Sequence, residues 1–264
     1  MQILKINYMK LDLLLLNKMK ITSVNNNLIE EVLSFKETKV QKEKNKYIIE
    51  GLKMVELAIQ KEVVEMILVE ERLFDKYKHL PNVVEISDNV SKKISDLKTN
   101  QGIFAVCKII ENKEYIDSNY LILDGIQDPG NLGTLIRSAY AFGFKNVICS
   151  KDSVSFYNPK VLRATQSNHF DLCLKNEDLT FFIDKLKQRN IIIVGTILRS
   201  ESSSVDEVKG EQVALILGNE GQGISKAVTQ KLNINIKIKT NPDLESLNVA
   251  IAGSILMNNF YSQN

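Results

Sequence analysis

The sequence predicts an α/β protein, because segments with the periodicity of helices alternate with short apolar strands through most of its length. The chain has 264 residues, of which 44% are hydrophobic and 25% are charged. This is the composition of an ordinary soluble protein, long enough for one large domain or two modest ones. A polar run at residues 111–119 divides the pattern, so we expect a small domain at residues 19–110, a linker, and a larger domain at residues 120–264.

The small domain is expected to contain both helices and strands. Helical spacing is found at residues 50–61 and 91–97, and strand-like apolar runs are found at residues 64–70, 83–87 and 102–109. Met19 begins a more typical stretch, so we interpret residues 1–18 as a non-structural leader or as the result of a start assigned too early. The apolar cluster at residues 13–16 is far shorter than a membrane span or a signal-peptide core, so no membrane partner is expected.

The larger domain shows the same alternation over a longer stretch. Expected strands cover residues 120–123, 147–149, 191–195, 213–217 and 234–238, and expected helices cover residues 132–141, 160–165 and 245–260. Short strands that alternate with helices predict a parallel sheet. Ligands of such sheets gather beyond the carboxyl ends of the strands, so polar residues that follow these strands are the functional candidates.

Cysteine and histidine usage argues against disulfides and against a metal centre. Cys107, Cys149 and Cys173 each lie in a strand-like run, and their spacing is that of neither a disulfide framework nor a thiolate metal site. His79 and His169 are far apart, without the spacing of metal ligands. We therefore expect a cytoplasmic protein without a metal.

A lysine-rich stretch is the candidate for contact with nucleic acid. The net charge of +2 does not by itself indicate a nucleic-acid-binding protein, but residues 36–46 carry five lysines against two glutamates. Such a patch can follow a phosphate backbone, and Lys42, Lys44 and Lys46 are the RNA-binding candidates. A solvated helix face or loop is the alternative interpretation.

The first polar segment that follows a strand covers residues 123–144. Gly130 and Gly133 permit a tight turn, and Asn131 and Arg137 stand six positions apart across the start of a helix. The segment lacks the Gly-Lys-Ser/Thr ending with which a nucleoside-triphosphate loop reaches the phosphates.

The second polar segment covers residues 215–225 and also connects a strand to a helix. Gly218, Gly221 and Gly223 give the order G-x-x-G-x-G, which differs from that of a dinucleotide-binding loop. No acidic residue closes the next strand to hold a ribose diol, so a dinucleotide is not expected.

The third polar segment covers residues 241–260, with a polar start before apolar residues at helical spacing. Asn241 or Asp243 could cap the helix. Ser246 and Asn248 are the functional candidates, and a role as capping or turn residues is the alternative for each.

Taken together, the three segments resemble the SpoU or TrmH family of RNA ribose 2′-O-methyltransferases. The family's first motif, N-x-G followed by an arginine, is matched by Asn131, Gly133 and Arg137; its second, G-x-E-x-x-G, by Gly218, Glu220 and Gly223; and its third, E-S-L-N-V, by residues 245–249. The resemblance implies a trefoil-knotted α/β domain of the SPOUT class. It extends weakly to residues 47–59, which resemble the start of the family's small, ribosomal-protein-like substrate-binding domain.

The chain departs from the family pattern at four places. Lys239 and Thr240 replace the proline and methionine of I-P-M, Pro242 and Ser167 replace common glycines, and Ala250 replaces a common serine. Contacts made by the backbone survive most side-chain changes, so the first departure is tolerable. The lost glycines affect the shape of the loops.

The resemblance implies S-adenosylmethionine as the cofactor. Its adenine and ribose would be held mainly by backbone groups around Thr196, Leu217, Gly218, Ile238 and Leu247. For the apolar residues of this set, a place in the plain core is the alternative.

The resemblance also implies that Arg137 acts at the 2′-hydroxyl. A guanidinium keeps its proton at any ordinary pH, so a grip on the neighbouring phosphate and stabilisation of the developing alkoxide are physically easier than general-base catalysis. Glu220 would orient this arginine or a neighbouring backbone group, with a structural ion pair between the two as the alternative. Asn131, Ser246 and Asn248 would fix the geometry of the hydroxyl and the loops.

The expected partners are RNA and a second copy of the chain. Ribosomal RNA is the first expectation and transfer RNA the alternative. An inactive knotted RNA-binding or ribosome-assembly factor is the rival of a different class. Family members pair through the knotted domain, so we expect a homodimer in which the apolar stripe of the last helix contributes to the interface.

Overall fold

A computed structural model describes residues 20–110, 113–197, 203–208, 210 and 212–262, so the expected leader lies outside the described residues. The chain divides into two compact units, an N-terminal unit of residues 1–110 and a C-terminal unit of residues 111–264. None of the helices in the described part of the chain is long and apolar enough to cross a membrane.

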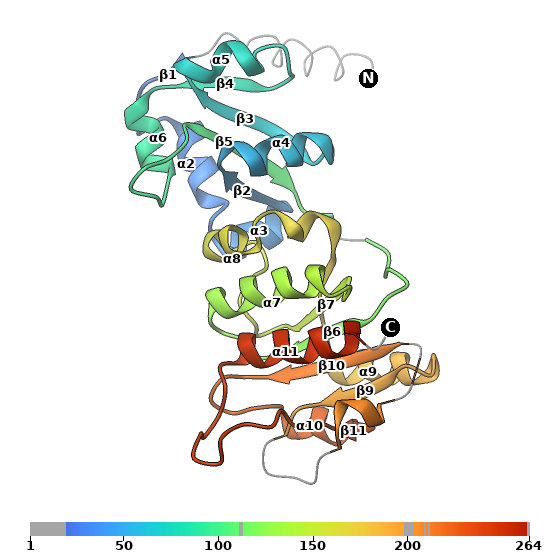
Figure 1. The fold of residues 1–264 in the computed structure, drawn as a ribbon. Coiled ribbons are helices and arrows are strands. Elements are labelled where there is room, and N and C mark those ends of the chain that lie inside the picture. Colours follow the sequence, from blue (N-terminus) through green and yellow to red (C-terminus); the bar gives the residue numbers. More distant parts are fainter. Residues whose placement is uncertain (1–19, 111–112, 198–202, 209, 211, 263–264) are drawn as a thin grey trace, which may run out of the picture. The chain divides into compact units, whose positions relative to one another are not determined.

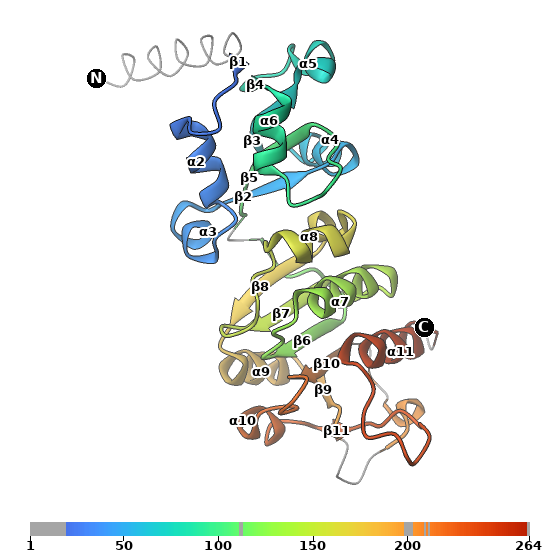
Figure 2. The same ribbon diagram turned by 90° about the vertical axis from the view of Figure 1, so that its left-hand side faces the viewer.

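The N-terminal unit is a mixed five-stranded sheet with helices on its faces (Figure 1). In spatial order, its strands are β1 (Lys20–Ile21), β4 (Val83–Ile86), β3 (Val64–Glu70), β5 (Ile103–Lys108) and β2 (Lys46–Glu50). Its helices are α2 (Asn27–Ser34), α3 (Thr38–Lys44), α4 (Leu52–Gln60), α5 (Glu71–Tyr77) and α6 (Asp88–Ile94). Helices α2 and α6 bury Ile29 and Val90 against Leu68 and Phe104 of the sheet, and α4 lies beyond the strands in Figure 2.

The three strands expected in this unit are confirmed, but the helices needed correction. The expected helix at residues 50–61 is shorter, because Glu50 belongs to β2 and α4 begins after Gly51. The helix expected at residues 91–97 is α6, which begins earlier at Asp88 and ends at Ile94. The turn after it is stabilised by Ser95, whose Oγ accepts from the Leu97 amide at 3.0 Å and donates to Glu50 at 2.6 Å.

The C-terminal unit is built on a fully parallel six-stranded sheet, as predicted. In spatial order, its strands are β11 (Ile234–Asn235), β9 (Ile192–Gly195), β10 (Val213–Gly218), β6 (Tyr120–Asp124), β7 (Asn146–Ser150) and β8 (Cys173–Glu177). The helical elements are α7 (Pro129–Ala141), α8 (Pro159–Thr165), η1 (Asn168–Asp171), α9 (Leu179–Gln188), η2 (Val205–Glu207), α10 (Lys226–Thr229) and α11 (Val249–Ser262).

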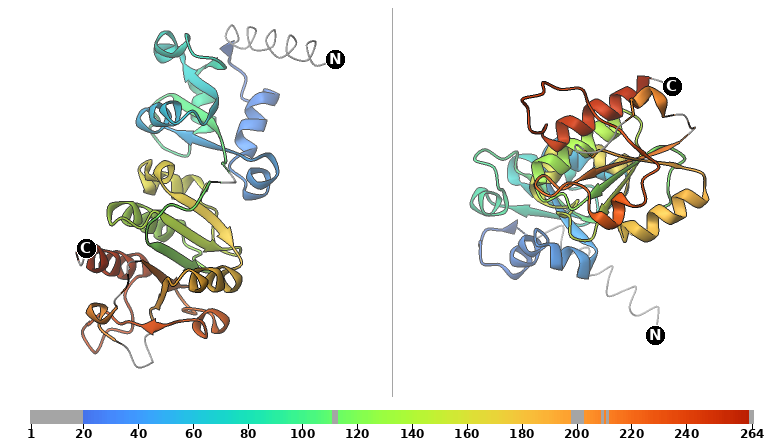
Figure 3. Two further views of the ribbon diagram at one scale, coloured as in Figure 1. Left: turned by 90° about the vertical axis from the view of Figure 1, so that its right-hand side faces the viewer. Right: turned by 90° about the horizontal axis from the view of Figure 1, so that it is seen from below.

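Alternate residues of these strands enter two separate cores. Leu121 and Leu215 pack with α7, α8 and α11 on one face, while Ile122 and Ile216 pack with α9 and α10 on the other. Figure 3 shows the two layers of helices on either side of this sheet. Coverage of both faces explains why the strands are continuous apolar runs.

The strand order changes direction at β6, which lies between β7 and β10. The chain moves outward from β6 through β7 to β8, and then returns to form β9 and β10 on the other side. Because β6 and β10 are neighbours, the loops that follow them start side by side at the carboxyl edge and lead to α7 and α10 on opposite faces of the sheet. Such a switch point is where open α/β sheets bind their ligands.

The last helix begins later than predicted. Residues 245–248 were expected to be helical, but α11 starts at Val249 because the Asn248 side chain accepts hydrogen bonds from the Ala250 and Ile251 amides, at 2.9 and 3.2 Å. These bonds cap the helix, so the preceding segment is free to follow a different path.

The described part of the expected linker is bound to the C-terminal unit. The Asn146 side chain at the start of β7 accepts from the Ile116 amide and donates to the Ile116 carbonyl, both at 2.8 Å. The Tyr115 hydroxyl donates to Glu177 at 2.8 Å. Residues 115 and 116 are therefore held along the edge of the C-terminal sheet.

Candidate active site at the switch point of the C-terminal sheet

The loop between β6 and α7 is shaped by the start of the helix. Asp128 is the N-cap of α7, and its carboxylate accepts from the Asn131 amide at 2.8 Å. Pro129 follows as the first helical residue, where its missing N–H costs nothing. These two residues fix the direction in which the Asn131 side chain leaves the helix.

Gly133, the glycine of the first motif, is required by packing. A Cβ atom at this position would lie 2.4 Å from the Ala164 Cβ and 2.9 Å from the Val161 carbonyl oxygen. Its absence allows α7 and α8 to approach closely. Gly133 therefore contributes to the site indirectly, by allowing the close packing of α7, the helix that carries Asn131 and Arg137.

The loop after β10 closes on itself. Asn219 and Gly223 exchange backbone hydrogen bonds of 3.0 and 2.9 Å, and Gly223 has a left-handed φ of 71°. A Cβ atom on Gly218 would lie 2.1 Å from the Gly223 carbonyl carbon. Two glycines of the second motif are thus explained by the tight turn that presents Glu220.

Residues from all three motifs meet in a chain of side-chain hydrogen bonds. The side-chain nitrogen Nδ2 of Asn131 donates to Glu220 Oε1 at 2.9 Å, and Nδ2 of Asn248 donates to Asn131 Oδ1 at 3.0 Å. Glu220 also accepts from the Asp128 backbone amide at 3.4 Å. Asn131 lies 89 positions from Glu220 and 117 from Asn248, so the fold creates this cluster.

Arg137 is exposed on α7, in the turns that follow Asn131. Its guanidinium makes no ion pair or hydrogen bond with the residues that the structure describes. The Glu220 carboxylate contacts Asn131 and the Asp128 backbone, so the ion pair considered as an alternative is absent from the described residues. Arg137 is available to an anionic ligand.

Ser246 belongs to the exposed segment before α11 and is not part of the hydrogen-bonded cluster. Within the described ranges its hydroxyl makes no hydrogen bond. The structure therefore joins three of the five candidate catalytic residues and leaves Arg137 and Ser246 outside their contacts.

Three of the candidate cofactor residues lie at the carboxyl ends of β9 and β10, because Thr196 follows β9 while Leu217 and Gly218 end β10. Gly195 pairs with Ile216 in the register of the two strands, which places Thr196 and Leu217 in adjacent positions. Asn235 holds the backbone just beyond Thr196, since its side chain accepts from the Ile197 amide at 2.6 Å and donates to the Ile197 carbonyl at 3.1 Å.

The side chains of these candidates differ in their burial. Leu217 is 1% exposed and packs in the core, so the core alternative holds for its side chain. Thr196, Ile238 and Leu247 are half-buried. Backbone groups with partly exposed apolar side chains fit the sugar and base of a nucleoside.

Three further residues, which were not among the functional candidates, hold the two loops together. Asp124 Oδ2 accepts from the Ser225 amide at 2.8 Å, and the Asn219 side chain donates to the Gly125 carbonyl at 2.7 Å. Asp128 caps α7. Asp128 had a detectable signal, because an aspartate before a proline and a helical run is a typical N-cap.

His169 lies in η1, which packs against α7 and α8, and is 5% exposed. Its Nδ1 lies 3.1 Å from the Thr165 hydroxyl. Burial, together with the positive charge of Lys113, lowers the pKa of His169 to about 3. The imidazole is therefore neutral at ordinary pH.

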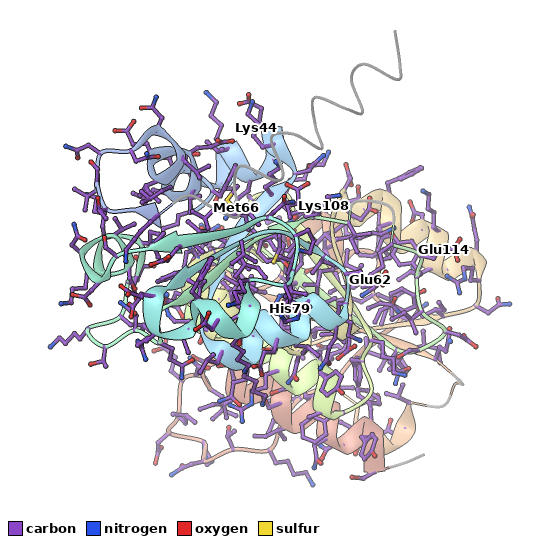
Figure 4. The ribbon with its side chains drawn as sticks, turned by 90° about the horizontal axis from the view of Figure 1, so that it is seen from above. Lys44, Glu62, Met66, His79, Lys108 and Glu114 are labelled. Carbon is purple, nitrogen blue, oxygen red and sulfur yellow. The ribbon has the colours of Figure 1, made fainter. Side chains whose placement is uncertain are left out.

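The lysine candidates of the N-terminal unit belong to regular structure. Lys42 and Lys44 lie in the last turn of α3, and Lys46 begins β2. Lys46 pairs with Glu65 at 2.7 Å, and Lys108 at the end of β5, which is labelled in Figure 4, lies 3.6 Å from the same carboxylate. Lys42 and Lys44 are exposed, so these two fit an external anion better than Lys46 does.

The fold and the site together define an α/β protein whose ligand site is assembled from three motif segments at a switch point. The model of the SpoU rRNA Methylase family matches residues 118–258, and that of the MRM3-like substrate binding domain matches residues 26–105. The chain belongs to the SpoU rRNA methylase family and is a methyltransferase.

Two curated relatives resemble this chain over most of their length. A Bacillus subtilis protein, 23S rRNA (guanosine(2553)-2′-O)-methyltransferase RlmP, is 33% identical over 197 residues, which cover 72% of this chain and 79% of the relative. The Coxiella burnetii 23S rRNA (guanosine-2′-O-)-methyltransferase RlmB is 31% identical over 200 residues, which cover 71% and 80%.

Solved structures share the fold. A putative RNA methyltransferase of the TrmH family from Porphyromonas gingivalis has a TM-score of 0.80 and 27% identity, and the match covers 91% of this chain and 99% of that one. The SpoU methyltransferase AviRb from Streptomyces viridochromogenes, in complex with AdoMet, has a TM-score of 0.82 at 19% identity over 90% of this chain and 98% of that one. At that identity the second likeness concerns the fold alone.

Proposed function

We propose that this protein transfers a methyl group from S-adenosylmethionine to a ribose 2′-hydroxyl of ribosomal RNA. The observation that carries this proposal is the hydrogen-bonded chain of Glu220, Asn131 and Asn248, which unites all three family motifs at one edge of the sheet. Ribosomal RNA is the substrate named for both curated relatives.

The cofactor would be held beyond the carboxyl ends of β9 and β10. Backbone groups around Thr196, Leu217, Gly218, Ile238 and Leu247 would hold its adenine and ribose. When bound, S-adenosylmethionine supplies a methyl group on a positively charged sulfur, so the chain has to position the acceptor oxygen and assist the loss of its proton.

Arg137 binds the phosphate next to the reacting ribose and stabilises negative charge that develops on the 2′-oxygen. Its exposure and its lack of a partner among the described residues support this role. Glu220, Asn131 and Asn248 keep the loops in register around the hydroxyl. Ser246, in the exposed segment before α11, would help to fix the geometry of the hydroxyl and the loops.

The C-terminal unit contains a trefoil knot and forms a homodimer. In support of the knot, α11 packs against α7, β10 and η2, so the end of the chain lies against the segment that follows β9. In support of the dimer, Ile251 and Ile255 of α11 are 53% and 38% exposed and lie one helical turn apart. Exposed apolar pairs of this kind often mark interfaces. The protein acts in the cytoplasm, where ribosomes are assembled.

The test uses labelled S-adenosylmethionine and total RNA from cells that lack this protein. A label in ribosomal RNA, at a linkage resistant to alkali and nuclease, is the expected result. If the label is found in transfer RNA alone, the substrate is transfer RNA and the proposal of ribosomal RNA is wrong. Failure of the folded protein to bind the cofactor in calorimetry would identify an inactive RNA-binding factor instead.

A further inference from the structure

Asn219 lies between Gly218 and Glu220 and is half-buried. Its Oδ1 accepts from the backbone amides of Gly221 and Gln222, at 2.9 and 3.0 Å. Its Nδ2 donates to the Gly125 carbonyl at 2.7 Å. One amide group therefore bonds to two different loops.

The two ends of this amide have separate effects. The oxygen stabilises the turn that follows β10, as asparagine commonly does in turns. The nitrogen reaches a residue 94 positions earlier in the chain, at the end of β6, where Gly125 has a left-handed φ of 76°. The bond from Asp124 to the Ser225 amide runs between the same two segments. The turn is thus fixed at two points to the strand that precedes α7.

These two fixed points determine where Glu220 lies. Gly125 is three residues before Asp128, which caps α7 and bonds to the Asn131 amide. Glu220 itself is exposed and directly follows Asn219. A shift of the turn would move the carboxylate away from the Asn131 side chain, which it meets at 2.9 Å.

We propose that Asn219 is a positioning residue for methyl transfer, because its side-chain amide locks the turn that carries Glu220 onto the end of β6. The proposal rests on the function proposed above. Displacements of about 1 Å at a reacting site can reduce rates by about a hundredfold, so the expected effect is on kcat.

The first test is Asn219→Asp. This change keeps the volume and the oxygen that accepts from Gly221 and Gln222, but it places a second oxygen against the Gly125 carbonyl. We expect kcat to fall by about a hundredfold, while the Kd for S-adenosylmethionine and the KM for RNA change by less than about fivefold.

Asn146→Asp is the matched control. The Asn146 side chain also accepts from a backbone amide and donates to a backbone carbonyl, both of Ile116, but at the amino end of β7. This variant should lose thermal stability and keep its kcat per folded molecule. If both aspartate variants lose kcat equally at equal folded fractions, the effect is general destabilisation and the proposal is wrong.

A double-mutant cycle tests whether Asn219 acts through Glu220. If it does, Asn219→Asp should cause little further loss of kcat in a Glu220→Ala background. If the double variant loses kcat by the full product of the two single losses, the residues act independently and the proposal is wrong. Asn219→Ser serves if the aspartate variant does not fold, since serine can close the turn but is too short to reach Gly125.

A spectroscopic measurement separates this proposal from the proposed function. The side-chain amide NMR signals of Asn131 and Asn248 need no substrate, and they should shift in Asn219→Asp and stay in place in Asn146→Asp. If the wild-type protein methylates no RNA, the proposed function fails and the amide signals still decide whether the lock exists. Unchanged amide signals in Asn219→Asp would contradict the proposal whatever the activity.

Discussion

At the residue scale, Asn248 combines two tasks that a sequence motif cannot separate. Its oxygen caps α11 through the Ala250 and Ile251 amides, and its nitrogen donates to Asn131. Asn248 is therefore a capping residue, as the sequence allowed, and it also belongs to the hydrogen-bonded cluster of Glu220 and Asn131. An amide has both an acceptor and donors, whereas an ionised aspartate has acceptors alone and could perform only the first task.

This division predicts different outcomes for two substitutions of Asn248. Asn248→Asp keeps the cap and gains favourable charge at the helix N-terminus, so stability should be unchanged or higher, but the bond to Asn131 is lost and kcat should fall about tenfold or more. Asn248→Ala should also lose about 1 kcal/mol of unfolding free energy. Urea titrations and methyl-transfer rates measure the two effects. Equal activity of the aspartate variant and the wild type would show that the contact with Asn131 is dispensable.

Ser167 is a residue at which the departure from the family pattern has a structural cost. It has a left-handed φ of 76° and is 3% exposed, directly after Gln166 with a φ of 49°. Ser167→Gly should therefore stabilise the C-terminal unit by about 1 kcal/mol, because glycine adopts this conformation without strain. Calorimetry should show a higher Tm. Asn168→Gly, at a residue without positive φ, is the control and should lower it.

At the element scale, the buried strands of the parallel sheet were predictable, whereas the edge strand β8 was not. Strands buried on both faces are continuous apolar runs. By contrast, β8 was missed because Lys175 and Asn176 interrupt its pattern at the edge of the sheet. The short helix α3 was missed because its lysines hide its helical spacing. The site residues could be recognised as motif members, but Asn219 could not, because a bond to a backbone group 94 positions away leaves no periodic signal.

The structure of α3 refines what the lysine-rich stretch is expected to do. Lys42 and Lys44 complement the C-terminal dipole of α3 and are exposed. Lys44 lies 3.6 Å from Glu43, a longer contact than the 2.7 Å ion pair between Lys46 and Glu65. Replacement of both Lys42 and Lys44 by alanine should weaken RNA binding and lower the slope of log K against log salt by about one unit or more. Lys46→Ala should have a smaller effect. Filter binding at several salt concentrations measures both.

The control for the lysine variants is Lys78→Ala, since Lys78 is also exposed in the N-terminal unit and pairs with Asp75. Cofactor affinity should be unchanged in all of these variants. An unaltered RNA affinity and salt slope for the Lys42 and Lys44 variant would leave only the alternative, a solvated helix face.

At the scale of the whole molecule, each unit has its own sheet and its own core, and each matches a separate family model. The proposed chemistry needs residues of the C-terminal unit alone. The N-terminal unit is then free to determine RNA affinity, and the division of labour can be tested with variants confined to one unit.

The proposed dimer gives a prediction at the same scale. Ile251→Asp combined with Ile255→Asp should convert the protein to a monomer, because two carboxylates would be buried in the interface. Both side chains are exposed within one chain, so its folding should persist. Phe181→Asp on α9, at a side chain 61% exposed, is the control and should stay dimeric. Sedimentation velocity measures the result, and a wild-type protein that is monomeric at micromolar concentration would disprove the dimer.

The switch point of the C-terminal sheet is the proposed site of methyl transfer to RNA. The most direct measurement compares methyl transfer to ribosomal RNA by the wild-type protein and by Arg137→Ala, with RNA retention and cofactor affinity measured in parallel. We expect the variant to lose transfer by at least about a hundredfold, because it no longer stabilises the reacting oxygen and phosphate, while it binds RNA and cofactor almost normally. Transfer by Arg137→Ala at the wild-type rate would contradict the claim.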